Sequence, residues 1–281
     1  MPDVDLASVS PVLAKTSDGI WKPKAARGET ISFPDDGHDA CFRLEDASLW
    51  FAHRNACIAA ALLRHGVDGP LLDVGGGNGA VSKALDDKGI ETVLLEPGPD
   101  GAQNARRRGV RNVVCATLQD ASFEAGSFGA AGAFDVIEHV EDDAALLGEI
   151  RRVLRPGGTL CVTVPAYGWL WSAEDEHAGH HRRYSLARLD ALLTRCAFRV
   201  DYATYFFAPF TLPVLLVRSL PHRVLPRRST EAVGEGAARQ HIMSPLPRRV
   251  MTSLLAPEIR RIAAGRRIPF GTSILAVATK A

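Results

Sequence analysis

The chain has 281 residues, of which 46% are apolar and 23% charged, and its formal net charge is +1. This composition is typical of a globular protein with a sizeable core, and it excludes a largely disordered chain. The sequence contains no internal repeat and no low-complexity tract.

Apolar runs bounded by glycine alternate with helical patterns from residue 70 onward. Before them, a loop-rich region ends in a helix at about Ser48–His65. The alternation predicts an α/β fold, a Rossmann-like doubly wound sheet of seven strands with helices on both faces. The expected strands are 70–76, 91–98, 112–118, 129–136, 159–165, 198–207 and 272–280, and the expected helices are 78–89, 101–109, 142–154 and 185–196.

The same pattern divides the chain into four parts. Residues 1–66 are predicted to be an N-terminal extension with a cap helix, and residues 67–207 a cofactor-binding core. Residues 208–267 interrupt the strand pattern and are rich in proline and arginine, so we expect a helical lid insert there. Residues 268–281 return as the last strand of the core sheet.

Charge is concentrated in the lid insert. Between Arg218 and Arg267 there are eleven Arg, three Glu and no Asp or Lys, so this stretch carries +8 and the remaining residues −7. A basic segment on an acidic body indicates either an anionic partner or a solvated, arginine-rich helical face.

Several features bear on the compartment. The first ten residues lack the basic and apolar regions of a signal peptide, and the most apolar tract, Tyr205–Leu220, is too short to span a bilayer and contains two prolines. The five cysteines are scattered without a C-x-x-C pair, which favours reduced thiols. We therefore expect a cytoplasmic protein with no transmembrane segment and no DNA partner.

A glycine-rich loop follows the first expected strand in the sequence LLDVGGGNGA. Gly75 and Gly77 would let the backbone turn tightly and approach a ligand. The spacing also fits a dinucleotide fingerprint. Asp73 argues against that interpretation, because a carboxylate in the turn repels a pyrophosphate and attracts an amino group. Glu96, at the end of the second strand, could accept hydrogen bonds from both hydroxyls of a ribose.

The stretch FDVIEHVEDD follows the fourth strand. On a helical turn, positions i, i+3 and i+4 share one face, so Asp135, Glu138 and His139 would point the same way. His177, His180 and His181 repeat this spacing after the fifth strand. Because both loops lie over the carboxyl end of the sheet, the two clusters could meet.

Together these motifs resemble those of the class I S-adenosylmethionine (SAM)-dependent methyltransferases. The longer stretch VPAYGWLWSAEDEHAGHHRRYS resembles a bacterial branch of small-molecule methyltransferases. The matching motifs, DVGGGNG, LLEPG, ATLQD, FDVIEHVED and LRPGGTL, occur in order over residues 67–207. The resemblance implies a seven-stranded sheet with an antiparallel last strand, and SAM as the cofactor.

The resemblance also implies roles for particular residues. Asp73, Gly75 and Gly77 would hold the methionine moiety, and Glu96, with Pro97 beside it, the ribose. Thr117 and Leu118 would lie at the adenine edge, and Phe134 near the sulfonium. Thr117 departs from the aspartate that the family often has there.

The turn that contains Glu138 and His139, here called the E-H turn, allows three interpretations. It is similar to the metal site of small-RNA 3′-terminal 2′-O-methyltransferases and to the turn of divalent-metal-dependent ubiquinone O-methyltransferases. On that analogy Asp135, Glu138, His139 and His180 would bind a divalent metal. The alternatives are a metal-free pocket in which Glu138, His139 and His180 act as acid and base, and a purely structural turn.

We expect methyl transfer to a small-molecule acceptor, at oxygen in preference to nitrogen or carbon. Arg182 and Arg183 could bind an anionic acceptor or lie on the surface. The other interpretations are a metal-dependent RNA 2′-O-methyltransferase, an NAD-dependent oxidoreductase and a non-catalytic SAM-binding partner. Five aromatic residues could line an acceptor pocket or belong to the core, namely Trp50, Phe51, Trp169, Trp171 and Tyr184.

Overall fold

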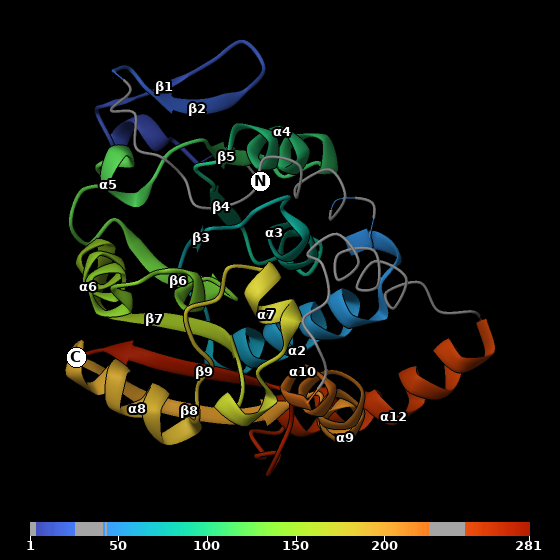
Figure 1. The fold of residues 1–281 in the computed structure, drawn as a ribbon. Helices are drawn as coiled ribbons and strands as arrows, with labels where there is room; N and C mark the ends of the chain where they lie inside the picture. The colour runs from blue at the N-terminus through green and yellow to red at the C-terminus, as the bar shows by residue number, and fades with distance from the viewer. Residues whose placement is uncertain (1–3, 26–41, 43, 225–244) are drawn as a thin grey trace.

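A computed structural model describes residues 4–25, 42, 44–224 and 245–281. Their strands form one nine-stranded sheet in the order β1-β2-β5-β4-β3-β6-β7-β9-β8 (Figure 1). The strands are β1 (Leu13–Lys15), β2 (Ile20–Pro23), β3 (Leu71–Val74), β4 (Thr92–Leu95), β5 (Asn112–Val114), β6 (Phe128–Phe134), β7 (Leu154–Pro165), β8 (Phe198–Phe206) and β9 (Ser273–Lys280).

Helices cover both faces of this sheet, as the sequence predicts. The longer ones are α2 (Leu49–His65), α3 (Ala80–Asp86), α4 (Pro99–Arg108), α6 (Asp143–Val153), α8 (Leu186–Arg195) and α12 (Pro245–Ala263). The shorter ones are η1 (Leu6–Ser8), α5 (Leu118–Ala121), η2 (Ile137–His139), η3 (Gly168–Leu170), α7 (Ala173–His177), η4 (Ala208–Phe210), α9 (Thr211–Val214), η5 (Leu215–Ser219) and α10 (Leu220–Val224).

Seven of the strands match the predicted ones in order and position. Strands β3 to β7 are mutually parallel where they pair, whereas β9 runs antiparallel to both of its neighbours, β7 and β8. The expected antiparallel last strand is therefore confirmed.

The count of seven strands was too low, because β1 and β2 were not recognised in the sequence. They form an antiparallel hairpin, and β2 extends the sheet through parallel pairing of Ile20 and Trp21 with β5. Each strand has only three or four residues, too few to show a clear alternation of apolar and polar side chains.

Two apolar clusters lie on opposite faces of the sheet. One packs α5, α6 and α8 against it, with Leu147 and Leu189 fully enclosed. The other packs α2, α3 and α12, through residues such as Ile58, Leu85 and Ile262. The central strand β3 lies between β4 and β6, so the chain reverses its direction of travel across the sheet at β3. In open α/β sheets ligands bind at this switch point, beyond the carboxyl ends of the strands.

Part of the predicted extension and part of the predicted lid, residues 26–41 and 225–244, lie outside the described residues. The cap helix is present as α2, with Ser48 as its N-cap. Within the insert, α12 packs against α2 and buries Leu255. Among the described residues, no helix is long and apolar enough to cross a membrane.

Candidate active site

The glycine loop after β3 has the conformation that its sequence predicts. Gly75 has a φ of +69°, and a side chain there would lie 2.9 Å from Val136, in the turn after β6. Gly77 also has a positive φ, and a Cβ there would meet no atom within 4 Å. The loop therefore brings its backbone close to the end of β6 and leaves open space beside Gly77.

Asp73 is buried at the carboxyl end of β3. The Ser82 hydroxyl donates a hydrogen bond of 2.6 Å to its Oδ2. Burial raises the pKa of Asp73 to about 6, against the opposing effects of this hydrogen bond and of the Arg54 charge. A carboxylate in such a place favours a ligand that brings its own positive charge.

Glu96 ties the glycine loop to the end of β4. Its Oε2 accepts a hydrogen bond of 2.9 Å from the Gly77 backbone N–H, and its Oε1 accepts one of 2.7 Å from Gly98. A carboxylate offers about four acceptor positions and can accept hydrogen bonds from hydroxyls as well as from backbone N–H groups. The structure thus brings Asp73, Gly75, Gly77 and Glu96 to one edge of the sheet.

The other residues expected at the cofactor lie at neighbouring strand ends. Thr117 caps α5, and its hydroxyl accepts a hydrogen bond of 3.0 Å from Asp120 N and donates one of 2.9 Å to the Asp120 carboxylate. Leu118 points into the core, whereas Phe134 ends β6 with its ring against Gly132. Their contacts with a cofactor stay predictions.

Asp135 does not share a helical face with Glu138 and His139, contrary to the sequence-based expectation. Its φ of +58° takes it out of the strand in a left-handed conformation, and only Ile137–His139 form a short helical turn. The Asp135 carboxylate instead accepts a hydrogen bond of 2.6 Å from Arg54.

Arg54 is a site residue that the sequence analysis missed. It lies on α2, only 8% exposed, with its guanidinium 5.1 Å from the ring centres of both Trp50 and Phe51. Its ion pair with Asp135 and its effect on the pKa of Asp73 place a positive charge between two strand ends. The only sequence signal is its spacing of four and three residues from Trp50 and Phe51, which does not show that α2 faces the site.

Glu138 is fully buried, and neither oxygen of its carboxylate has a hydrogen-bond partner among the described residues. Burial, together with the nearby charge of Asp135, raises the pKa of Glu138 well above its usual range. A buried carboxyl group without a partner is costly unless it is protonated or meets a ligand.

His139 and His180 meet as expected, with their ring centres 4.7 Å apart. Burial and the neighbouring charge of His180 lower the pKa of His139 to about 4, so this imidazole is neutral at pH 7. His181 N donates to the Glu138 carbonyl at 2.8 Å and holds the two loops together. The expected shared helical face of His177, His180 and His181 is wrong, because α7 ends at His177.

Asp175, a second residue that the sequence analysis missed, orients His180. Its Oδ1 lies 2.8 Å from His180 Nδ1, and Arg183 donates to its two oxygens at 2.7 and 2.9 Å. Burial by itself would raise the pKa of Asp175, but the hydrogen bonds from His180 and Arg183 bring it down to about 2. The ionised carboxylate can only accept, so Nδ1 carries the proton and Nε2 is left as a base.

The described residues also contain a set of potential metal ligands here. One ligand atom each from Glu138, His139 and His180 lie within 4.8 Å of one another. The predicted fourth ligand, Asp135, is not in this set, and its carboxylate accepts a hydrogen bond from Arg54.

Comparisons with known proteins identify a domain within this chain. Residues 72–162 match the methyltransferase domain family, and the fold is shared with SAM-dependent methyltransferases. The matched part of the chain is a methyltransferase domain. The predicted resemblance is thereby confirmed for the core.

A curated relative is similar to part of this chain. The ubiquinone biosynthesis O-methyltransferase of Xanthomonas oryzae pv. oryzae is 31% identical over 96 residues, 32% of this chain and 40% of that protein. The chain thus matches less than half the length of this curated relative.

Two solved structures show the fold alone. A SAM-dependent methyltransferase from Thermotoga maritima has a TM-score of 0.56 at 18% identity, over 88% of this chain and 97% of its own. A methyltransferase from Haloferax volcanii, solved in complex with the Trm112 methyltransferase activator, has a TM-score of 0.58 at 17% identity, over 89% and 99%.

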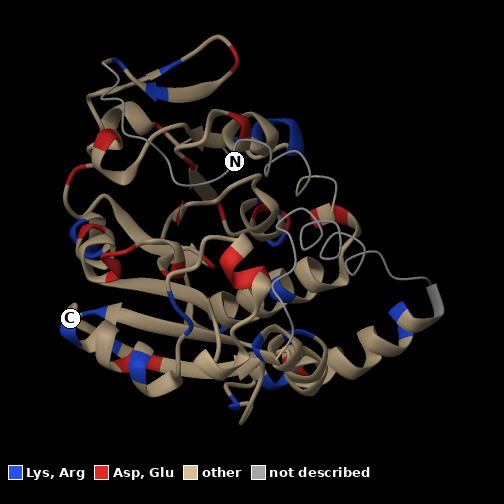
Figure 2. Cartoon of the chain, in the orientation of Figure 1, with Lys and Arg blue, Asp and Glu red and all other residues tan. Residues whose placement is uncertain are grey.

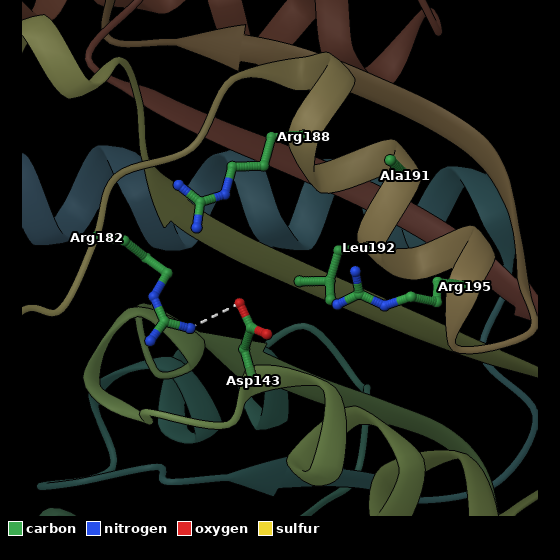
Figure 3. Close-up of a pocket in the computed structure, with 6 residues that line it drawn as sticks. All are labelled: Asp143, Arg182, Arg188, Ala191, Leu192 and Arg195. Atoms are coloured by element: carbon green, nitrogen blue, oxygen red, sulfur yellow. Dashed lines mark ion pairs between the residues drawn. The ribbon is translucent and has the colours of Figure 1, made fainter.

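A cavity of about 220 Å³ lies between α6 and α8 (Figure 3). Asp143 forms an ion pair of 2.9 Å with Arg182 there, and Arg188 and Arg195 face the cavity from α8. Because Arg183 is held by Asp175, both arginines that could bind an anionic acceptor are already paired with carboxylates.

The aromatic residues have different environments. Tyr184 is fully buried and donates to Asp143, so it belongs to the core and not to an acceptor pocket. Trp50 stacks on Phe207 with ring centres 5.2 Å apart, while Trp169 is 43% exposed.

Proposed function

We propose that this protein transfers a methyl group from SAM to the hydroxyl of a small-molecule acceptor. The observation that carries the proposal is the Asp175–His180 pair beside a neutral His139, where the loops after β6 and β7 meet. An oriented imidazole with a free Nε2 has the chemistry of a general base at neutral pH.

The cofactor would lie along the edge formed by β3, β4, β5 and β6. Ionised Asp73 would attract the cofactor's ammonium group, and Arg54 its carboxylate, while Gly75 and Gly77 allow close approach. Glu96, next to Pro97, would bind the ribose. Thr117 and Leu118 would border the adenine, and Phe134 would border the sulfonium. Arg54 extends the predicted set and is supported by its position beside Asp73.

Methyl transfer is an in-line displacement at the sulfonium. The acceptor oxygen forms the new bond to the methyl carbon as the carbon–sulfur bond breaks, and S-adenosylhomocysteine leaves as a neutral thioether. The acceptor's proton passes to His180 Nε2, and Asp175 stabilises the resulting imidazolium through Nδ1. The main contribution of the remaining site residues is to hold the acceptor oxygen in line with the carbon–sulfur bond that breaks.

A divalent metal is a second candidate in the same pocket, and the unpartnered carboxylate of Glu138 is the observation that favours it. Glu138, His139 and His180 would hold the ion, and the bond from His180 to Asp175 resembles the second-layer support usual for metal-bound histidine. Nitrogen and oxygen ligands suit manganese, iron, zinc or nickel. A bound metal would lower the pKa of an acceptor hydroxyl.

Metal content distinguishes the two versions. If Glu138 is simply a protonated buried acid, Glu138→Gln leaves the metal content of purified protein unchanged, and chelators do not affect turnover. If Glu138 binds a metal, elemental analysis finds about one ion per chain, and Glu138→Gln loses it.

The reaction itself is tested with SAM and a panel of small phenols, catechols and alcohols, with a short RNA and NAD as comparisons. We expect calorimetric binding of SAM but not of NAD, and S-adenosylhomocysteine release with a hydroxylated small molecule. Turnover of RNA alone would favour the RNA methyltransferase alternative. SAM binding without turnover of any acceptor would favour a non-catalytic partner.

The thiols support a proposal about compartment. Among the described residues Cys57, Cys115, Cys161 and Cys196 are all free. Free thiols are usual where glutathione keeps proteins reduced, and we place the protein in the cytoplasm on this ground.

A further inference from the structure

The helical segment 211–224, formed by α9, η5 and α10, turns its polar side toward the protein. The Ser219 hydroxyl donates to the Leu170 carbonyl at 2.8 Å, and Arg218 lies 3.4 Å from Glu174. His222 lies 3.6 Å from Glu176. These contacts fix the segment on η3 and α7, the helix that carries Asp175.

The opposite side of the same segment is an apolar stripe that faces solvent. Its members follow a spacing of about four residues, which places them on one helical face. A surface helix normally has the reverse arrangement, with its apolar side buried and its polar side in water. The exposed fractions are 61% for Leu212, 53% for Leu216, 66% for Val217, 40% for Leu220 and 77% for Val224.

The insert that contains this stripe is basic, although the two arginines of the segment itself bind the Glu174 carboxylate and the Trp169 carbonyl. The described parts of the insert, 208–224 and 245–267, contain eight Arg and a single Glu, and that Glu, Glu258, is buried. On α12, Arg248 and Arg249 are exposed beside Val250, which is 55% exposed. Figure 2 shows acidic residues on α7 and basic ones around α10 and along α12.

We propose that segment 211–224 docks on an anionic lipid surface. An exposed apolar stripe on a helical segment of a basic insert is the pattern of a helix that lies in the plane of a membrane interface. The apolar side chains would enter the boundary of the acyl chains, and the exposed arginines of the insert, such as Arg223, Arg248 and Arg249, would meet lipid phosphates.

The charges disfavour a second copy of this chain as the occupant. A twofold interface through the stripe would place the same arginine-rich surface of both copies together, and like charges across an interface are unfavourable. An anionic bilayer is complementary to both the apolar and the basic part of this surface.

Vesicle flotation of the full chain tests the proposal. We expect the protein to float with vesicles of phosphatidylcholine mixed with phosphatidylglycerol, and to bind phosphatidylcholine alone much more weakly. Raising the salt concentration should weaken binding, because it screens the arginines.

Substitutions in the stripe make the test specific. Leu212→Gln combined with Leu216→Gln should lower vesicle affinity about tenfold for each side chain, since each loses the transfer of a leucine out of water. The matched control is Leu63→Gln, a 58% exposed leucine on α2 outside the stripe, which should bind as the wild type. Unchanged SAM binding in all variants checks that they fold.

Three outcomes would overturn the proposal. They are the absence of binding to anionic vesicles, equal binding by the double variant and the wild type, and a dimer in light scattering that the double variant dissociates while vesicles capture neither. The last outcome would assign the stripe to a second copy of the chain.

Discussion

Single charged residues near the carboxyl edge of the sheet owe their properties to burial more than to their identity. Asp73 and Glu138 have raised pKa values, and His139 has a lowered one, each with burial as the largest cause. Asp175 shows the opposite result, because the hydrogen bonds from His180 and Arg183 outweigh the effect of its burial on the pKa. Groups shifted in this way are common at reaction sites.

The raised pKa of Asp73 predicts a pH dependence for cofactor binding. Below a pKa of about 6 the carboxyl group is protonated and loses its attraction for the ammonium group of SAM. Calorimetric affinity should therefore be constant near neutral pH and fall as the pH drops through 6, by up to about tenfold per unit. Asp73→Asn should bind weakly at all pH values, without this dependence.

A matched control for this experiment is Asp86→Asn. Asp86 ends the neighbouring helix α3, and burial raises its pKa. Its carboxylate accepts a hydrogen bond from the backbone N–H of Thr92 and not from the glycine loop. This variant should keep the wild-type profile. If Asp73→Asn also kept it, Asp73 would not be the group that binds the ammonium.

The Asp175–His180 pair predicts an effect on turnover. His180→Ala should lower methyl transfer about 10²–10⁴-fold, the usual contribution of a general base. Asp175→Asn should also lower turnover, and should shift the ascending limb of the pH–rate profile, because the amide no longer stabilises the imidazolium. The radiolabelled methyl group transferred from SAM measures both.

His177→Ala is the control for the histidine variants, because His177 is exposed at the end of α7 and outside the pair. It should turn over at the wild-type rate. Normal rates for both His180→Ala and Asp175→Asn would show that the Asp175–His180 pair is structural and does not take part in methyl transfer.

At the scale of single elements, Glu258 joins α12 to the end of β8. Its carboxylate accepts hydrogen bonds of 2.8 Å from the backbone N–H groups of Phe207 and Ala208, and lies 2.8 Å from His53 Nε2 on α2. Cys57 adds a potential metal ligand to His53 and Glu258. The backbone bonds already occupy Glu258, so we interpret this group as a structural clamp.

Removal of this clamp should destabilise the protein. Glu258→Ala leaves one buried and one half-buried N–H group without acceptors, and we expect a loss of about 3 kcal/mol in the free energy of unfolding. Denaturant titration measures it. Glu149→Ala, which breaks the partly exposed pair with Arg152, should cost less than about 1 kcal/mol. Equal losses in the two variants would contradict the assignment.

At the scale of the whole molecule, residues 208–267 contain two kinds of structure. Leu255, Glu258 and Ile262 belong to the packed layer on α2, whereas segment 211–224 adds an outward apolar stripe. A deletion of the complete insert would therefore open the core, and a useful truncation has to keep the second half of α12.

We predict that replacing residues 212–253 with a short Gly-Ser linker separates the two roles. The buried contacts of α12 remain, so SAM should bind with nearly wild-type affinity in calorimetry. Methyl transfer should be abolished, because residues 212–224, which contact η3 and α7, would cover the acceptor. Full activity in this truncated chain would exclude a lid function for the insert.

The sequence by itself determined the succession of β3 to β9 and the position of the glycine loop. These follow from local patterns: apolar runs for buried strands, glycines where φ is positive, and a carboxylate at the end of each of two strands. The hairpin β1–β2 was not predicted from the sequence, because its strands are too short to show such a pattern.

Only the tertiary structure decided which groups meet. Arg54 and Asp135 are 81 residues apart in sequence, and their pairing depends on how α2 packs against the sheet. Asp175 orients His180 because the chain after α7 returns toward it, which the spacing of the histidines does not reveal. The outward stripe of segment 211–224 is a further case. The sequence predicts only that it belongs to a helical insert, whereas contacts to Glu174, Glu176 and Leu170 hold its polar side inward.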